Sequence, residues 1–268
     1  MITLFGDYGH IIEVNQDTFP DGTLHISLPD EDIRAVEWNY ESDAELFTLI
    51  CIRKHYADCD MRLILPYIPH ARMDRVKAPT DVFTLKYFCQ IINDLNFDEV
   101  WVLDAHSNVS LALLDRVAPI PVTGCIKEAI KRTHVDKEDL ILFFPDEGAM
   151  KRYSSESDLP YAFGMKDRDW ETGKIKGLRL INEELIKGKN VLIVDDICSR
   201  GGTFLHAAKA LRSAGAKDIY LYVTHAEHTM IDGEMYNDLD LVKKIITTDT
   251  IFQQRWDNLN KVDIIQNY

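Results

Sequence analysis

The feature that constrains the fold most is a regular alternation between short apolar runs and segments with helical periodicity. Five runs are continuously apolar, which is typical of strands covered on both faces of a sheet. They span residues 61–68, 99–105, 140–146, 190–196 and 218–225. Segments 42–58, 81–96 and 201–216 have apolar residues at helical spacing, and the first opens with a capping-box spacing at Ser42 and Glu45. This order predicts an α/β fold whose parallel sheets are flanked by crossover helices.

Two further segments resemble paired antiparallel strands. Residues 10–29 have turn residues at Asp21 and Gly22, and residues 167–181 form two short extended runs joined through Gly173. Pro and Gly cluster at residues 119–124, which is the best domain boundary. We therefore expect two domains, 1–122 and 123–268, with the tail after about residue 246 packing back on the first domain.

The overall charge is acidic, with 44 Asp and Glu against 30 Lys and Arg and a net charge of −14. This argues against non-specific binding to nucleic acid, which needs a basic surface, but not against small phosphorylated ligands held through a metal ion. No apolar stretch approaches the roughly 20 residues needed to cross a membrane, and the first residues lack a secretory signal. Five cysteines without disulfide or metal spacing fit a reducing compartment, so we expect a cytoplasmic protein.

The residues best suited to bind a ligand lie in the run VLIVDDICSRGGT, at residues 191–203. Asp195 and Asp196 end a predicted strand, and the residues after them form the turn into a helix. Glycines allow backbone N–H groups to approach a phosphate, and a helix N-terminus adds partial positive charge. The spacing of a Walker loop is absent. The carboxylates suit sugar hydroxyls or a magnesium ion, so the run predicts a phosphorylated-sugar site; the alternative is a tight turn with solvated aspartates.

The same run resembles the PRPP-binding loop shared by type I phosphoribosyltransferases and ribose-phosphate pyrophosphokinases (PRPP synthetases). Six other segments resemble the second family, in the same order along the chain. They are FPDGTLHI (19–26), LPYIPHARMDRVKAP (65–79), TLKYF (84–88), VLDAHS (102–107), FFPDEGAMKR (143–152) and MKDRD (165–169). The resemblance implies two tandem type I phosphoribosyltransferase-like domains, with ATP on the N-terminal side and ribose 5-phosphate on the C-terminal side.

The resemblance also implies an activity and its residues. Members of the family transfer the β,γ-diphosphoryl group of ATP to the 1-hydroxyl of ribose 5-phosphate with Mg²⁺, which gives PRPP and AMP, and they assemble as dimers or hexamers. By position, the implied catalytic residues are Lys166, Arg168 and His106, and the implied metal-associated residues are His106 and Asp146. The implied ribose 5-phosphate ligands are Asp195, Asp196, Ser199, Arg200, Gly201, Gly202 and Thr203. The implied ATP ligands are Phe19, Asp21, Arg72, Asp74, Arg75, Lys77 and His106.

The chain differs from the family pattern at two positions that the resemblance assigns to contacts with adenine. Thr23 and Met73 stand where the family has a glutamate and a glutamine, and residues 74–83 carry fewer cations than the family's mobile loop. Two alternatives remain open: a phosphoribosyltransferase that uses PRPP and a base, and a non-catalytic regulatory protein on the same fold.

Overall fold

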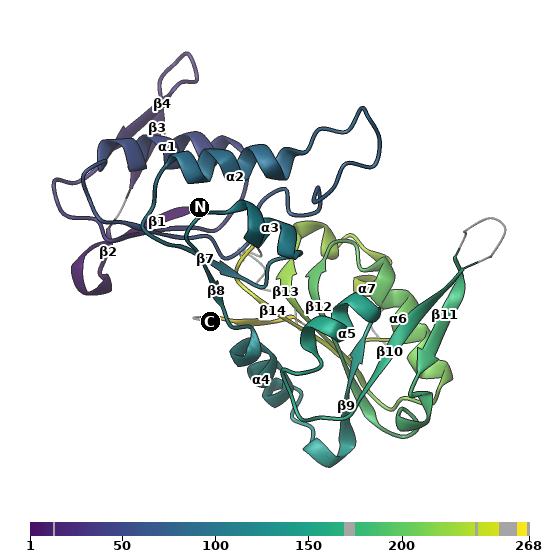
Figure 1. Cartoon of the computed structure of the whole chain (residues 1–268). Coiled ribbons are helices and arrows are strands. Elements are labelled where there is room, and N and C mark those ends of the chain that lie inside the picture. Colours follow the sequence, from purple (N-terminus) through teal and green to yellow (C-terminus); the bar gives the residue numbers. More distant parts are fainter. Residues whose placement is uncertain (13, 169–174, 239–240, 252–261, 267–268) are drawn as a thin grey trace. The chain divides into compact units, whose positions relative to one another are not determined.

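The computed structural model describes residues 1–268 apart from 13, 169–174, 239–240, 252–261 and 267–268, and it describes only the backbone of residues 166–168, 175–177 and 237. The chain divides into two compact units, Met1–Pro121 and Val122–Tyr268 (Figure 1). The division falls inside the Pro- and Gly-rich segment 119–124. Each unit has its own hydrophobic core.

The first unit is built on a mixed sheet. In the described residues its strand order is β2-β1-β5-β6-β7-β8. Strands β5, β6, β7 and β8 are parallel neighbours, whereas β1 pairs antiparallel with β2 and β5. The strands are β1 (Ile2–Phe5), β2 (Ile11–Ile12), β5 (Ala35–Trp38), β6 (Arg62–Ile64), β7 (Val100–Leu103) and β8 (Val117–Ile120).

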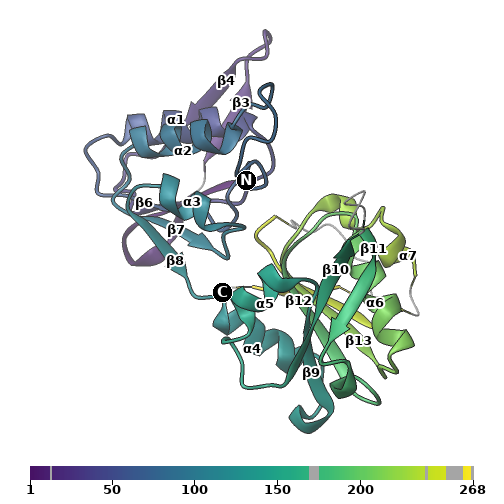
Figure 2. The ribbon, with the colours of Figure 1, turned by 45° about the vertical axis from the view of Figure 1, so that its right-hand side comes forward.

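Helices connect successive parallel strands of this unit. They are α1 (Ala44–His55), α2 (Thr84–Asp94) and α3 (Asn108–Leu113), and α1 and α2 lie side by side over the sheet (Figures 1 and 2). The Glu45 carboxylate accepts hydrogen bonds from the backbone N–H groups of Glu41 at 2.9 Å and Ser42 at 3.4 Å. The predicted capping box is therefore half formed, because Ser42 donates its backbone N–H while Asp43 occupies the N-cap.

A separate hairpin projects from the first unit. Strands β3 (Asn15–Thr18) and β4 (Leu24–Ser27) pair antiparallel and stand clear of α1 and α2 (Figures 1 and 2). The flanking Val14 and Leu28 pack against the core, but residues 15–23 are all exposed. The hairpin predicted from Asp21 and Gly22 is confirmed, and Gly22 takes a left-handed φ of 83°.

The second unit is built on a longer, mostly parallel sheet. In the described residues its order is β11-β10-β9-β12-β13-β14-β15, and only the β10–β11 pair is antiparallel. The strands are β9 (Leu140–Phe144), β10 (Tyr161–Arg168), β11 (Ile175–Ile181), β12 (Asn190–Cys198), β13 (Ile219–Ala226), β14 (Lys244–Thr248) and β15 (Val262–Ile265). The described residues of β9, β12 and β13 are almost wholly buried, as their continuous apolar sequences predict.

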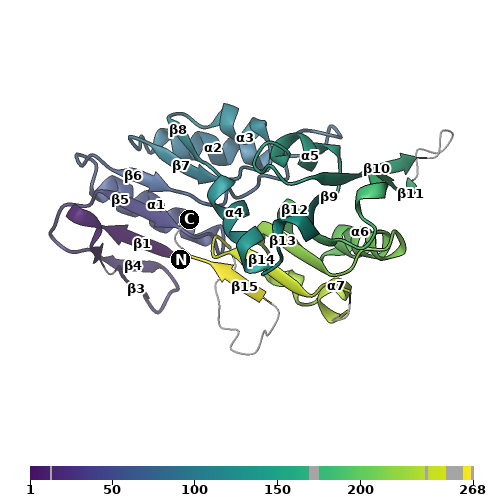
Figure 3. The same cartoon turned by 90° about the horizontal axis from the view of Figure 1, so that it is seen from below.

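Helices cover both faces of this sheet. Figures 2 and 3 show α4 (Thr123–Arg132) and α5 (Glu147–Tyr153) on one face and α6 (Gly202–Ser213) and α7 (Glu234–Asn237) on the other. The chain moves from β9 outward to β10 through α5, and from β12 in the opposite direction to β13 through α6. The direction of winding therefore reverses between β9 and β12. In open α/β sheets, ligands bind at such a switch point, beyond the carboxyl ends of the strands.

The structure confirms the five predicted strands and the three predicted helices, with shifted ends; β6 is only partly buried, because Arg62 is exposed. Strand β12 continues past Asp196 to Cys198, because β13 extends to Ala226 and pairs with it. The strand pair expected at 167–181 starts earlier, at Tyr161, and Gly173 lies outside the described residues. The tail was expected on the first domain, but β15 instead pairs with β14 in the sheet of the second unit. None of the described helices is long and apolar enough to cross a membrane.

Strand β15 is fastened to α4 by Arg132, whose side chain is 23% exposed. Its guanidinium bonds the Asp263 carboxylate, the Ile264 carbonyl at 2.9 Å and the Glu128 carboxylate at 2.9 Å. We predict that Arg132→Met lowers the free energy of unfolding by about 1–3 kcal/mol, because it removes the guanidinium hydrogen bonds to these three acceptors. The neighbouring Lys131, 79% exposed and 3.4 Å from Glu128, is the control, and Lys131→Met should cost less than about 0.5 kcal/mol. Equal losses in urea titrations of the two variants would show that Arg132 does not fasten the strand.

Candidate functional site

The candidate residues of the second unit follow three neighbouring strands. Asp146 comes two residues after β9, Asp195 and Asp196 lie in the last part of β12, and the backbone of Lys166 and Arg168 lies at the end of β10. Since β10, β9 and β12 are adjacent and parallel, their carboxyl ends meet at one edge of the sheet. The structure thus brings Asp146, Asp195 and Asp196 to the switch point, whereas the backbone of Lys166 and Arg168 lies on β10 beyond its last pairing with β9, Phe163 to Phe144.

Asp146 marks the beginning of α5. It has extended backbone angles, and its side chain accepts a hydrogen bond from the backbone N–H of Ala149 at 3.1 Å. This is an ordinary aspartate N-cap, which occupies one carboxylate oxygen and fixes the direction of the carboxyl group. The side chain remains half-buried at the strand end.

The two adjacent aspartates of β12 differ in their surroundings. Successive residues of a strand point to opposite faces, so the carboxylates leave the strand in different directions. Asp195 is half-buried and accepts a hydrogen bond from the Asp196 backbone N–H at 3.0 Å. Asp196 is buried, and one carboxylate oxygen lies 3.5 Å from Nη1 of Arg152. Burial, followed by the negative charge of Asp196, raises the pKa of Asp195 to about 8.

Arg152 is a site residue to which the sequence analysis assigned no role. It lies in the last turn of α5, and its guanidinium lies 5.6 Å from the ring centre of Tyr153. Tyr153 is fully buried and stacks on Phe144 of β9, which fixes the position of the helix end. Arg152 ends the segment FFPDEGAMKR, six residues after Asp146. This short spacing was the one sign in the sequence that Arg152 could lie near the site.

The 199–203 loop connects β12 to α6. Gly201 is the N-cap residue and takes a left-handed conformation with φ of 74°, which glycine adopts at little cost. Gly202 and Thr203 are exposed at the start of the helix, and the backbone N–H of Leu205 bonds the Gly201 carbonyl. The first backbone N–H groups of an α-helix have no partner within the helix. The loop therefore presents the start of a twelve-residue helix beside the two aspartates.

The candidate residues of the first unit divide into two groups. His106 follows β7, and residues 72–77 follow β6, its parallel neighbour. The backbone N–H of Leu103 bonds the Pro66 carbonyl, so these two connections start together at one sheet edge. His106 is half-buried, whereas Arg72, Arg75 and Lys77 are exposed; Asp74 accepts a hydrogen bond from Nε of Arg75 at 3.0 Å.

Phe19 and Asp21 form the second group, at the turn of the β3–β4 hairpin. Phe19 is 51% exposed, and its ring centre lies 5.1 Å from that of His25. The carboxylate of Asp21 accepts hydrogen bonds from the hydroxyl and the backbone N–H of Thr23, which lower its pKa. The threonine that replaces the family's glutamate therefore serves the turn itself.

The described residues contain no group of three or more His, Cys, Asp or Glu side chains placed to hold a metal ion. The two residues expected beside a metal, His106 and Asp146, belong to different units. Carboxylate oxygens nevertheless gather at the switch point, and Mg²⁺ commonly uses one or two protein carboxylates, with waters and substrate phosphates completing its shell. The donor set fits a magnesium ion that arrives with a phosphorylated substrate.

Comparisons with known proteins support the fold described above. Residues 144–255 match the family model described as "Phosphoribosyl transferase domain". The fold resembles the crystal structure of phosphoribosylpyrophosphate synthetase from Mycobacterium smegmatis, with a TM-score of 0.78 and 19% identity over 96% of this chain and 87% of that one. The fold is therefore an α/β fold with type I phosphoribosyltransferase-like domains.

Proteins with similar sequences identify the family within this fold. The ribose-phosphate pyrophosphokinase of Saccharolobus solfataricus is 30% identical over 273 residues, covering 95% of this chain and 88% of the relative. The ribose-phosphate pyrophosphokinase of Sulfurisphaera tokodaii is 29% identical over 258 residues, covering 91% and 86%. The chain belongs to the ribose-phosphate pyrophosphokinase family.

The raised pKa of Asp195 predicts a pH-dependent loss of stability. A carboxyl group whose pKa is higher in the folded state than in the unfolded state stabilises the fold at low pH, and this contribution is lost as the pH rises through the folded value. Between pH 6 and pH 9, wild type should therefore lose about 2–3 kcal/mol relative to Asp195→Asn, since each unit below a pKa of about 8 corresponds to 1.36 kcal/mol. Denaturant titrations in a metal-free buffer with chelator measure this difference.

The exposed Asp158, substituted as Asp158→Asn, is the control and should follow wild type at every pH. A stability curve for Asp195→Asn that also follows wild type would mean that the Asp195 carboxyl is ionised throughout this range.

Proposed function

We propose that the protein is a ribose-phosphate diphosphokinase that transfers the β,γ-diphosphoryl group of ATP to the 1-hydroxyl of ribose 5-phosphate, giving PRPP and AMP. The observation that carries the proposal is the 199–203 loop, which opens α6 beside Asp195 and Asp196 at the switch point of the second unit. Family membership across nearly the whole chain supports the same reaction.

The second unit would bind ribose 5-phosphate. The first N–H groups of α6 and the hydroxyls of Ser199 and Thr203 are donors for the phosphate, with Gly201 and Gly202 keeping side chains out of its way and Arg200 adding charge. The acids would then bind sugar hydroxyls. Asp195 is the better placed of the two for a direct hydroxyl contact, because Asp196 is buried beside Arg152.

Lys166 and Arg168 would stabilise the transferring group. The last pairing between β10 and β9 joins Phe163 to Phe144, so Lys166 lies three residues further along β10. At about 3.3 Å per residue, its backbone extends roughly 10 Å beyond that pairing, past the edge where Asp146 caps α5. Two polyanions must meet in this reaction, and cations that follow the developing charge lower its barrier.

The first unit would bind ATP. Its candidates are His106 and the group Arg72, Asp74, Arg75 and Lys77, which follow neighbouring strands, together with Phe19 and Asp21 on the projecting hairpin. An exposed aromatic ring on a projecting hairpin suits stacking on adenine, and it suits contribution to a site in a second subunit. We therefore propose a homo-oligomer, a dimer or a hexamer, that uses Mg²⁺ associated with Asp146 and His106. Bound Mg²⁺ would neutralise phosphate charge.

A coupled assay tests the reaction directly. With ribose 5-phosphate, ATP and Mg²⁺, we expect AMP and PRPP to form in equal amounts. The match of residues 144–255 to the phosphoribosyl transferase domain makes PRPP consumption with a purine or pyrimidine base the informative comparison. Turnover only in that second mixture would replace the proposal with a transferase, and binding of ribose 5-phosphate without any turnover would indicate a regulatory protein.

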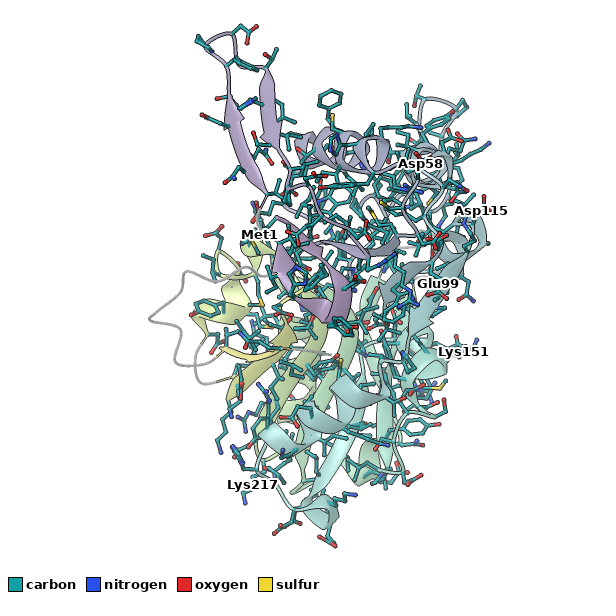
Figure 4. The ribbon with its side chains drawn as sticks, turned by 90° about the vertical axis from the view of Figure 1, so that its left-hand side faces the viewer. Met1, Asp58, Glu99, Asp115, Lys151 and Lys217 are labelled. Atoms are coloured by element: carbon teal, nitrogen blue, oxygen red, sulfur yellow. The ribbon has the colours of Figure 1, made fainter. Side chains whose placement is uncertain are left out.

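The proposed role of Lys166 predicts a specific kinetic loss. Lys166→Ala should lower kcat by about a hundredfold or more, equivalent to about 3 kcal/mol of transition-state stabilisation, with little change in unfolding. Lys151 is the matched control, because it is exposed on α5 and forms a surface ion pair with Glu147 at 2.8 Å (Figure 4). Lys151→Ala should keep wild-type kcat, and a Lys166→Ala enzyme with near-normal kcat would remove Lys166 from the mechanism.

A further inference from the structure

The 199–203 loop lies against a second segment of the same unit, residues 227–235. This segment follows β13 and contains the 3₁₀ turn His228–Met230 and the beginning of α7. The contact begins where the strands end, because the Glu227 backbone N–H bonds the Cys198 carbonyl at 2.8 Å. We call residues 227–235 the support segment.

Thr229 of the support segment contacts the first residue of the loop. Its Oγ1 lies 3.0 Å from Oγ of Ser199, and both side chains are half-buried. A hydroxyl has one donor and two acceptor positions. If Thr229 donates to Ser199, the Ser199 hydroxyl keeps its own proton for another acceptor, such as a phosphate oxygen. Thr229 thereby orients a hydroxyl that the loop offers to a ligand.

Gly233 touches the next loop residue through its backbone. A Cβ atom at Gly233 would lie 2.0 Å from the carbonyl oxygen of Arg200 and 2.7 Å from its carbonyl carbon, far inside van der Waals contact. Gly233 is buried, so its backbone is closely packed and has little free space to move into. Only glycine permits this approach, and the approach fixes the Arg200 peptide that leads into Gly201.

Met235 completes the contact under Gly201. A Cβ at Gly201 would lie 2.9 Å from Cε of Met235, whose side chain is 2% exposed and belongs to the core. The left-handed turn of the loop therefore rests on a buried side chain. Four consecutive residues, from Cys198 to Gly201, each have a defined contact with the support segment.

We infer that the support segment fixes the conformation of the 199–203 loop, and that Thr229 and Gly233 are positioning residues for its anion-binding groups. A loop that must present several N–H and O–H groups to one phosphate binds more tightly when these groups are ordered beforehand. Neither residue needs to touch the ligand. The consequence for ribose 5-phosphate rests on the proposed function, whereas the ordering of the loop does not.

Amide hydrogen exchange on the ligand-free protein tests the ordering. In Thr229→Val, which keeps the shape and removes the hydroxyl, amides of residues 199–203 should exchange several-fold faster than in wild type. Thr229→Ser restores a hydroxyl and should restore slow exchange. Unchanged exchange at residues 199–203 in Thr229→Val would overturn the inference, whatever ligand the loop binds.

Calorimetric titration with ribose 5-phosphate tests the consequence. Thr229→Val should weaken binding about fivefold, as the loss of one ordered hydrogen bond does, with kcat and the KM for ATP nearly unchanged and with Thr229→Ser close to wild type. Gly233→Ala should weaken it on the order of tenfold or more, because the Arg200 carbonyl must move.

Gly124→Ala is the control for the glycine substitution, since a Cβ at Gly124 meets nothing within 4 Å. It should bind ribose 5-phosphate like wild type. If Gly233→Ala fails to fold, Thr229→Val still tests the inference.

If wild type binds ribose 5-phosphate and Thr229→Val binds it with the same affinity, the positioning role of Thr229 is contradicted. Absence of binding in wild type refutes the proposed function instead, and hydrogen exchange alone then decides whether the support segment orders the loop.

Discussion

The site depends on the pairing of β12 with two buried neighbours. β12 is hydrogen-bonded to β9 on one side and to β13 on the other, and both of its faces are covered. A shift of one residue in this register would turn every side chain to the opposite face, so the register is strongly specified. It places Asp196 on the side of Arg152 and starts the loop at Ser199. The pairing with β13 continues to Ala226, which also sets where the support segment begins.

The register of β12 brings several carboxylates together at the switch point, where the described residues include few cationic side chains. Asp195, Asp196 and Asp146 influence one another electrostatically, and the pKa of Asp195 rises because its ionised form is desolvated and close to a like charge. Arg152 balances one of these charges at 3.5 Å. A bound magnesium ion would balance more, as would Lys166 and Arg168 at the end of β10. The acid cluster is thus suited to a ligand that brings a divalent cation with it, which is how a metal-bound polyphosphate arrives.

The sequence predicted most of what depends on local pattern. Continuous apolar runs identified β9, β12 and β13, because strands buried on both faces leave little room for polar residues. It did not identify β5, a four-residue strand that includes Glu37, nor the addition of β15 to the second sheet, because neither has a distinctive local pattern. In the site, residues within recognisable segments were predicted, whereas the contact of Ser199 with Thr229 spans 30 positions and leaves no local trace.

The candidate residues of the two units differ in how far they are ordered in advance. Ser199, Arg200 and Gly201 of the 199–203 loop each contact the support segment, so the first part of the loop is held in place before any ligand binds. The turn that carries Phe19 and Asp21 is held chiefly by its own hydrogen bonds to Thr23, while residues 15–23 remain exposed. Binding at a preordered loop loses little conformational entropy, whereas binding through an exposed hairpin must order side chains as it occurs. Under the proposed function, selectivity for the sugar phosphate would therefore be built into the fold of the second unit, whereas recognition of the nucleotide base would depend on exposed groups that become ordered as the nucleotide binds.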